Sequence, residues 1–222
     1  LKSDDYRQRC TRLRGSVMLI GPMLARFGVG YIPKPGGDKI GRRRLDTHFL
    51  GFQKLGAKFN FDIADEFFMV EGKELKGTYM LLDEASVTGT ANIVMAAVLA
   101  KGSTTIYNAA REPEIVDLQN FINAMGGNVR GAGGSIITVE GKRALHGGKY
   151  RIIADRIVGA TYLCAAACCG GEVRLRGVDP RPLSTVSGAL SEAGCTVKSG
   201  EDDVFLQSDG SLRSIRPVRT AP

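Results

Sequence analysis

The sequence predicts an α/β fold built from a repeated unit, in which helices are buried inside a surrounding layer of β-sheet. Three segments follow one plan: an Ala/Leu-rich helix, a strand, a loop, a second helix ending in glycine, and two strands. The glycines after the second helices, Gly56, Gly126 and Gly194, are 70 and 68 positions apart. The first helices are apolar almost all round, which is typical of helices covered on every side.

Each copy supplies the same elements in the same order. The first copy is predicted to contain helices at 18–28 and 46–55 and strands that start at 30 and at 67. The second contains helices at 91–101 and 114–125 and strands at 102–107 and 135–141. The third contains a helix at 157–169, a helix through Leu190 and strands at 171–175 and 203–207. Glycine recurs at the helix ends because it adopts the left-handed conformation at little steric cost.

The repeat also predicts the domain organisation. One unit alone cannot cover its apolar first helix, so several units must pack together. The pattern passes from the second copy to the third between Tyr150 and Ile157. We therefore expect a first domain over 1–152, carrying a loop at 35–44, and part of a second domain over 153–222. The chain begins at a residue other than Met and ends without a terminating pattern, so we interpret it as a piece of a longer protein.

Charge and composition narrow the class of ligand. Thirty Lys and Arg against 23 Asp and Glu give a net charge of +7, which suits nucleic acid, an acidic membrane surface or a phosphorylated small molecule. With 7% aromatic residues and no Trp, few positions are available for base stacking. No apolar stretch reaches the ~18 residues of a membrane span. A phosphate-bearing metabolite is therefore favoured over nucleic acid or membrane, with a merely solvated basic surface as the alternative.

The cysteines indicate neither a disulfide framework nor a metal site. A chain of this length does not depend on disulfides, and the two histidines, His48 and His146, lie far from the cysteines in sequence. We expect small, reduced, buried side chains and a cytoplasmic protein. The cysteines are Cys10, Cys164, Cys168, Cys169 and Cys195.

The loop at 35–48 differs from its counterparts in the other copies. It opens with Pro-Gly-Gly, carries one carboxylate and four cations up to Arg44, and leads into a helix. Helix N-termini bind anions through free backbone N–H groups, and guanidinium groups add bidentate contacts. The spacing alone is equally compatible with a solvent-exposed basic loop.

Longer motifs make a family resemblance specific. The chain resembles the UDP-N-acetylglucosamine 1-carboxyvinyltransferases, members of the enolpyruvyl transferase family, essentially from end to end. The motifs that carry the resemblance are 19–28, 35–48, 108–117, 145–148, 154–156 and 218–221. The resemblance implies an inside-out α/β barrel: two domains, each a threefold array of βαβαββ units, both incomplete here. It also implies transfer of the enolpyruvyl group of phosphoenolpyruvate to the 3′-hydroxyl of UDP-N-acetylglucosamine through a tetrahedral ketal, with release of phosphate. No metal or organic cofactor is implied, and the reaction begins peptidoglycan synthesis.

The resemblance also assigns roles to residues. Asp38 falls at the family's proton donor. The residues expected to bind substrate are Arg14, Arg43, Arg44, Leu45, Asp46, Thr47, Ser86 and Val87. Among them Asp46 matches the position that holds the uracil ring, and Arg43 matches an arginine that contacts ligand phosphates. Residues expected to support the site from behind are His48, Arg111, Glu112, Glu114, Asp155 and Arg156, and a capping or surface role stays open for His48.

Several positions depart from the family pattern. Most members carry cysteine where this chain has Asp38, and Arg44 and Glu84 stand where proline and lysine are usual. A carboxyl of pKa ~3.9 is ionised at neutral pH, unlike a thiol of pKa ~8.5. We hypothesise that loop closure and the negative charge of the nearby substrate phosphates raise the pKa of Asp38 and so favour its protonated form. Because a carboxylate is a poorer nucleophile than a thiolate, the resemblance also predicts resistance to fosfomycin, which alkylates the cysteine.

The resemblance also implies what this chain lacks, and it leaves other functions open. The family's Lys-Asn pair would precede Leu1 and its aspartate base would follow Pro222, so this chain alone is expected to be inactive. The alternatives are the shikimate-pathway enolpyruvyl transferase and a non-catalytic module that binds a phosphate ligand or nucleic acid.

Overall fold

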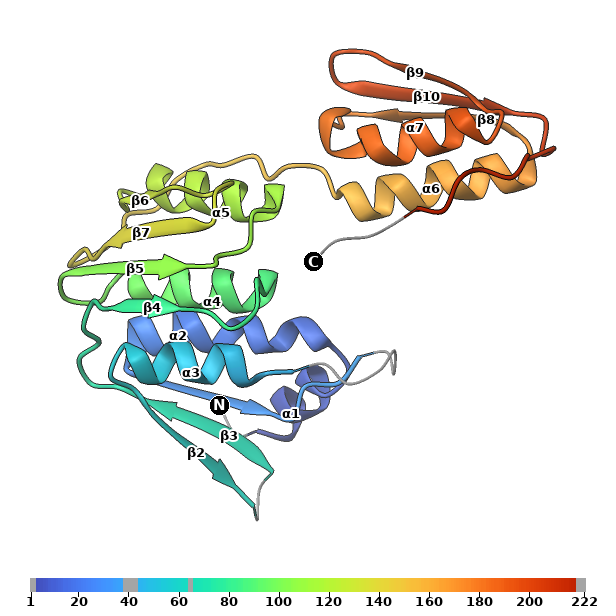
Figure 1. Cartoon of the computed structure of the whole chain (residues 1–222). Helices are drawn as coiled ribbons and strands as arrows, with labels where there is room; N and C mark the ends of the chain where they lie inside the picture. The colour runs from blue at the N-terminus through green and yellow to red at the C-terminus, as the bar shows by residue number, and fades with distance from the viewer. Residues whose placement is uncertain (1–2, 38–43, 64–65, 219–222) are drawn as a thin grey trace. The chain divides into compact units, whose positions relative to one another are not determined.

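The computed structural model describes residues 3–37, 44–63 and 66–218. The chain folds into two compact units, 1–150 and 151–222. Unit 1 contains the first two copies of the repeat and unit 2 contains the third (Figure 1).

The first copy follows a short N-terminal helix. The N-terminal helix is α1 (Asp4–Cys10). The first copy consists of the 3₁₀ helix η1 (Arg14–Leu19), α2 (Ile20–Phe27), β1 (Val29–Pro33), α3 (Asp46–Lys54), β2 (Lys58–Asp62) and β3 (Phe67–Glu71). The second copy consists of β4 (Tyr79–Leu81), α4 (Val87–Ala97), β5 (Ser103–Tyr107), α5 (Pro113–Ala124), β6 (Val129–Arg130) and β7 (Ile136–Glu140). The second copy is thus a βαβαββ unit, in which α4 connects the parallel strands β4 and β5.

The third copy lies in unit 2. Its elements are α6 (Arg156–Cys169), β8 (Gly171–Arg176), the 3₁₀ helix η2 (Arg181–Leu183), α7 (Ser184–Glu192), β9 (Thr196–Ser199) and β10 (Asp203–Ser208). Five of the six main helices lie close to their predicted ranges, whereas α4 begins and ends four residues before the predicted 91–101. Gly56, Gly126 and Gly194 have φ of 94°, 89° and 111°, which confirms their left-handed helix-ending role.

Strand order confirms that the three copies share one structural plan. In each sheet the strand that follows the first helix pairs antiparallel with the last strand, which then pairs with the middle strand. The orders are β1-β3-β2, β4-β5-β7-β6 and β8-β10-β9. The predicted α/β architecture of repeated units is therefore correct.

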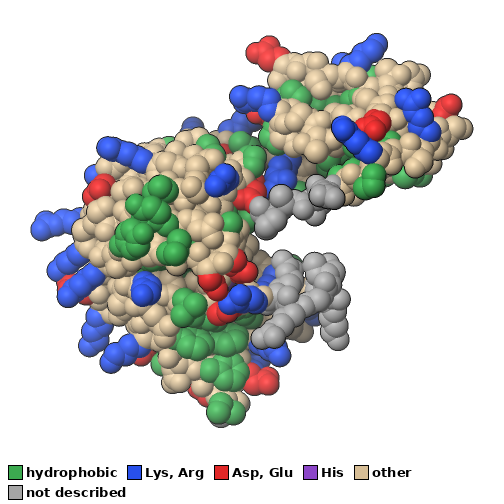
Figure 2. Space-filling model, viewed as in Figure 1, with side chains coloured by type: hydrophobic (Ala, Val, Ile, Leu, Met, Phe, Trp, Pro, Cys, Tyr) green, Lys and Arg blue, Asp and Glu red, His purple; other side chains and the backbone are tan. Residues whose placement is uncertain are grey.

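Helix α4 lies in the core of unit 1. It packs on α2 and α3, and nearly all its residues from Gly89 to Ala97 are buried. The inner faces of the sheets contribute Ile32, Val70, Ile106 and Ile137 to the same core. Their outer faces meet solvent, where Tyr79, Leu81 and Ile136 are exposed; Figure 2 shows such hydrophobic patches on unit 1.

Helix α6 departs from the expectation of complete burial. Leu163 and Ala167 face the small core of unit 2, but Ile157 and Tyr162 are 57% and 59% exposed. One copy provides one sheet, and one sheet covers one side of a helix. The expectation of buried cysteines is wrong for the same reason: Cys10 and Cys195 are buried, whereas the α6 residues Cys164, Cys168 and Cys169 are exposed.

None of the helices that the structure describes has the length and apolar character needed to cross a bilayer.

Candidate active site

Polar side chains and helix starts gather at one end of unit 1. Strands β4 and β5 are parallel, so α4 and α5, which follow them, begin at the same edge of their sheet. Helix α3 begins beside α4, where Thr47 bonds Glu84, and Figure 1 shows the three helices starting at one end. The first N–H groups of a helix have no partner within the helix, so this end of unit 1 is suited to anions.

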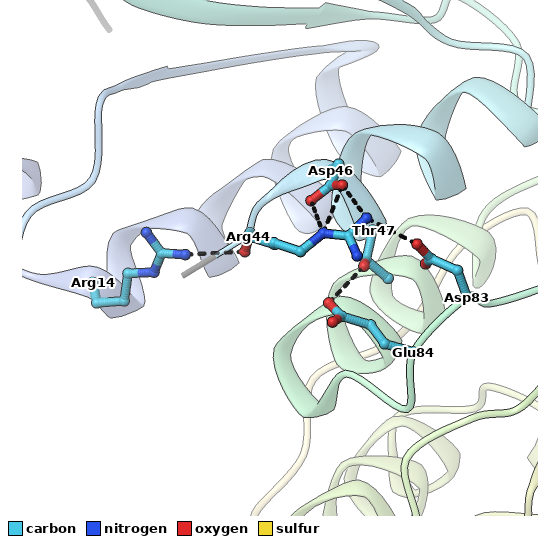
Figure 3. Close-up of polar contacts among 6 residues, drawn as sticks. All are labelled: Arg14, Arg44, Asp46, Thr47, Asp83 and Glu84. Carbon is cyan, nitrogen blue, oxygen red and sulfur yellow. Dashed lines mark hydrogen bonds and ion pairs between the residues drawn. The ribbon is translucent and has the colours of Figure 1, made fainter. Parts of the chain in front are cut away.

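Five of the predicted substrate-binding residues lie here, in η1 and at the start of α3. Figure 3 shows Arg14, Arg44, Asp46 and Thr47 among them. Arg14 donates from Nη2 to the carbonyl oxygen of Arg44 at 3.1 Å. The Arg44 guanidinium holds Asp46 with Nε at 3.0 and 2.8 Å from the two carboxylate oxygens, and with a further Nη2 contact. The Leu45 carbonyl accepts from the backbone N–H of His48 and thereby starts the helix. The structure thus brings Arg14, Arg44, Leu45, Asp46 and Thr47 together.

Two acidic residues join this group: Glu84, which the sequence analysis noted as a departure from the family pattern, and Asp83, which it did not single out. Arg44 Nη2 also donates to Asp83 at 2.9 Å, and the Thr47 hydroxyl donates to Glu84 at 2.9 Å. The carboxylates of Asp46 and Asp83 raise the pKa of Arg44, chiefly through its hydrogen bonds to Asp46. The pairing of these residues across 37 and 39 positions is not visible in the sequence.

The start of α4 contributes two more of the predicted substrate residues. Ser86 is the N-cap of α4, and its hydroxyl accepts from the backbone N–H of Gly89 at 3.2 Å. Val87 is the first residue of the helix and is partly buried. Ser86 and Val87 therefore lie next to Glu84 and across from Thr47, as a second wall of the same site.

Behind these walls, a buried polar network joins η1, α2, α3 and α4. Asn92 of α4 is fully buried; its Oδ1 accepts from Gly21 N–H at 2.8 Å, and its Nδ2 donates to the Val17 carbonyl at 2.8 Å. The same Nδ2 lies 3.0 Å from His48 Nδ1, so Nδ1 accepts and the proton belongs on Nε2, which faces the Thr88 hydroxyl at 3.3 Å. The sequence analysis missed Asn92, although a lone amide within an apolar helical run was the available signal.

His48 is a neutral residue of this network. It is 1% exposed, which excludes the surface role left open for it. Burial, and then the positive charge of Arg14, lower the pKa of His48 to about 4 against the opposing effect of Asp46. The imidazole therefore positions the start of α3 without adding charge at neutral pH.

The second copy offers a short loop, 108–112, at the same end. Asn108 has φ of 56° and donates from Nδ2 to the Leu82 carbonyl, while Ala110 N–H donates to the buried Thr90 hydroxyl at 3.1 Å. Glu112 precedes α5, and its Oε2 is buried without a hydrogen-bond partner among the described residues. Arg111 and Glu114 are largely solvent-facing. The side chains of Arg111, Glu112 and Glu114 thus belong to the end of unit 1 that holds the site.

The loop between β1 and α3 starts against η1. A Cβ at Gly36 would lie 1.5 Å from the Thr11 carbonyl oxygen, and Gly37, with φ of 94°, packs on Arg14. Glycine is therefore required here because the backbone approaches another backbone closely. Asp38 and Arg43, the predicted proton donor and phosphate ligand, lie outside the described residues.

Asp155 and Arg156 belong to unit 2. Asp155 is the N-cap of α6 and accepts from the backbone N–H groups of Ile157 and Val158 at 2.8 and 3.0 Å. Arg156 is the first residue of that helix. Capping accounts for Asp155 within its own unit.

Two pockets are lined by residues of unit 1. A small one of about 180 Å³ lies between α3 and β4 and is lined by Thr47, Leu50, Met80 and Asp83. A larger one of about 940 Å³ lies where α2 and α3 end, with Arg26, Lys58, Lys73 and Lys101 among its lining residues. Helix C-termini carry the negative end of the dipole, so the cations there offset the helices' own charge. Across the described parts of the chain, no group of His, Cys, Asp and Glu side chains is arranged to hold a metal ion.

Comparison with known proteins identifies the family to which the chain belongs. The family model described as EPSP synthase (3-phosphoshikimate 1-carboxyvinyltransferase) matches residues 3–220. The chain belongs to this enolpyruvyl transferase family. A Bacteroides fragilis protein named UDP-N-acetylglucosamine 1-carboxyvinyltransferase is 47% identical over 97% of this chain and 52% of its own length. A Porphyromonas gingivalis protein of the same name is 44% identical over the same shares. The chain spans about half the length of the curated relatives it matches.

Solved enolpyruvyl transferases share the fold. The enolpyruvyl transferase NikO from Streptomyces tendae matches with a TM-score of 0.74 at 18% identity, over 91% of this chain and 49% of that one. EPSP synthase from Acinetobacter baumannii matches with a TM-score of 0.62 at 23% identity, over 90% and 47%. The predicted enolpyruvyl transferase fold is thus confirmed.

Proposed function

We propose that the intact protein transfers the enolpyruvyl group of phosphoenolpyruvate to the 3′-hydroxyl of UDP-N-acetylglucosamine and releases phosphate. The observation that carries the proposal is the 44–47% identity, over 97% of this chain, to proteins named for that reaction. A transferase of the first committed step of peptidoglycan synthesis would act in the bacterial cytoplasm on these two small molecules.

The site of unit 1 supports an anionic substrate. Three helix N-termini and Arg14 face one end, which suits the diphosphate of a sugar nucleotide. On this proposal Ser86 and Val87 at the start of α4 contact the diphosphate, while Asp46 with Arg44, Leu45 and Thr47 holds the uracil ring. His48 supports that wall from behind, and Arg43 binds phosphate.

Asp38 is the proposed acid. Addition requires a proton at the methylene carbon of phosphoenolpyruvate while the sugar 3′-hydroxyl attacks the neighbouring carbon. The sugar hydroxyl loses its proton as the C–O bond forms. The resulting tetrahedral ketal then loses phosphate and a proton of its new methyl group, which restores the double bond. Asp38 fulfils this role only when protonated, and loop closure over the bound phosphates favours its neutral form.

The two units are proposed to be parts of the two domains of such an enzyme, with 1–152 in the first and 153–222 in the second. Asp155 and Arg156 would then belong to the second of these domains.

The test is phosphate release by the intact protein with phosphoenolpyruvate and one acceptor at a time. We expect turnover with UDP-N-acetylglucosamine and none with shikimate 3-phosphate. The second acceptor is included because the family model is described as EPSP synthase. Turnover with shikimate 3-phosphate alone would contradict the proposal and favour the shikimate-pathway reaction. Salt-sensitive oligonucleotide binding without turnover would favour a non-catalytic module.

A further inference from the structure

Two polar contacts connect the segment that begins α3 to the turn that precedes α4. Arg44 donates to Asp83 and Thr47 donates to Glu84, each at 2.9 Å (Figure 3). We call these four residues the α3–α4 bridge. Its two contacts start from residues three positions apart at the beginning of α3 and end on neighbouring residues before α4. A paired attachment of this kind fixes both the spacing of two segments and their relative rotation.

The bridge also fixes the carboxylate of Asp46. Arg44 holds both oxygens of Asp46 while it reaches Asp83, and its own carbonyl accepts from Arg14. Rotation of the Arg44 side chain would therefore release Asp46 and Asp83 together. The guanidinium has the planar, multidentate geometry that such a junction needs, and a lysine ammonium does not.

The two contacts differ in exposure. Arg44, Asp46 and Asp83 have side chains 45–48% exposed, so the ion pairs are accessible to solvent. Thr47 is 2% exposed, which makes the second contact a sheltered one. Exposed ion pairs contribute modestly to stability, so the bridge serves geometry more than folding.

We propose that Asp83 and Glu84 are positioning residues for the sugar nucleotide: through Arg44 and Thr47 they hold the α3 wall and the α4 wall of its site at a fixed separation and aim Asp46 at the ligand. This inference rests on the proposed function. Asp83 and Glu84 act through their partners and do not themselves contact the reacting atoms.

The decisive variant is Asp83→Asn in the intact protein, assayed for phosphate release with each substrate varied in turn. A role in positioning predicts a KM for UDP-N-acetylglucosamine that rises roughly fivefold, the upper range for an exposed ion pair. The KM for phosphoenolpyruvate and kcat should change far less. If the carboxylate acted only through its charge, removing it near an anionic ligand would lower that KM or leave it unchanged. Either of those results overturns the inference.

Two further variants sharpen the test. Arg44→Lys keeps the charge but loses the multidentate geometry, so it should raise the same KM, and combining it with Asp83→Asn should add little. Fully additive effects would contradict a shared bridge. Asp179→Asn is the matched control, because Arg181 holds Asp179 in unit 2 through Nε and Nη2, as Arg44 holds Asp46. It should leave both KM values unchanged.

The failure of the inference is distinguishable from failure of the proposed function. No turnover by the unsubstituted protein with UDP-N-acetylglucosamine overturns both. Turnover by the unsubstituted protein, with an unchanged KM in Asp83→Asn, overturns the positioning role alone.

Discussion

The connection from β1 to α3 and the connection from β5 to α5 occupy the same place in two copies of one repeat. The first, 34–45, has twelve residues, five of them cationic, while the second, 108–112, has five residues with one Arg and one Glu. The short connection is anchored by Asn108 and by the bond from Ala110 to Thr90. The difference teaches that the repeat supplies a common scaffold, and that a single connection of it can be lengthened and made cationic. On the proposed function, this lengthened connection carries the catalytic acid.

The largest expected difference between the two connections is chemical reactivity. The unsubstituted intact protein should resist time-dependent inactivation by fosfomycin, because a carboxylate at position 38 is a poor nucleophile. Asp38→Cys should become inactivated, with a covalent adduct that peptide mass spectrometry places at residue 38. An adduct at Asp38 in the unsubstituted protein would contradict this expectation, and the exposed Cys164 serves as an internal control for non-specific alkylation.

The stability of the protein should also depend on pH, because the buried third residue of α3, after the long connection, is His48, whereas the buried third residue of α5 is Ile115. The pKa of His48 is about 4 in the folded protein, below its ordinary 6.5. Stability is therefore complete above pH 6.5 and falls as the unfolded chain takes up the proton, by roughly 3 kcal/mol between pH 6.5 and 4. Urea unfolding across this range measures the loss. In His48→Asn, whose Oδ1 replaces Nδ1 as acceptor, that part of the pH dependence should disappear; an unchanged profile would contradict the assignment.

The start of the long connection should be intolerant of side chains. Gly36→Ala places a methyl group against the Thr11 carbonyl and should cost about 1–3 kcal/mol in unfolding free energy, the usual range for overpacking. Gly15→Ala, four positions after Thr11, has open space around its Cβ and should change stability little. Equal effects of the two substitutions would show that the close contact at Gly36 is unimportant.

The smallest effect concerns the anchor of the short connection. Thr90→Val keeps the shape of the side chain but leaves the Ala110 N–H without its buried partner, which should cost about 1–2 kcal/mol. Thr90→Ser retains the hydroxyl and should cost less. Amide exchange at Ala110 reports on this bond directly, and unchanged exchange in Thr90→Val would contradict its role.

Local sequence signals predicted the repeat, its helix ends and its family, because glycine termini and apolar periodicity are properties of short segments. Long-range polar pairing was not predictable in the same way. Asn92 meets Gly21 and Val17 across 71 and 75 positions, and the partners of Arg44 and Thr47 are equally remote. Helix α6 illustrates the converse: its apolar sequence predicted full burial, but burial depends on what packs beside it, and one sheet leaves Tyr162 exposed.

The central claim is that the long connection carries the acid. The most direct measurement compares kcat for phosphate release from phosphoenolpyruvate and UDP-N-acetylglucosamine in Asp38→Asn and in Arg111→Ala of the short connection. Asp38→Asn should lower kcat about a hundredfold or more, as expected for loss of a general acid, while Arg111→Ala should have a much smaller effect. Full turnover by Asp38→Asn would contradict the account.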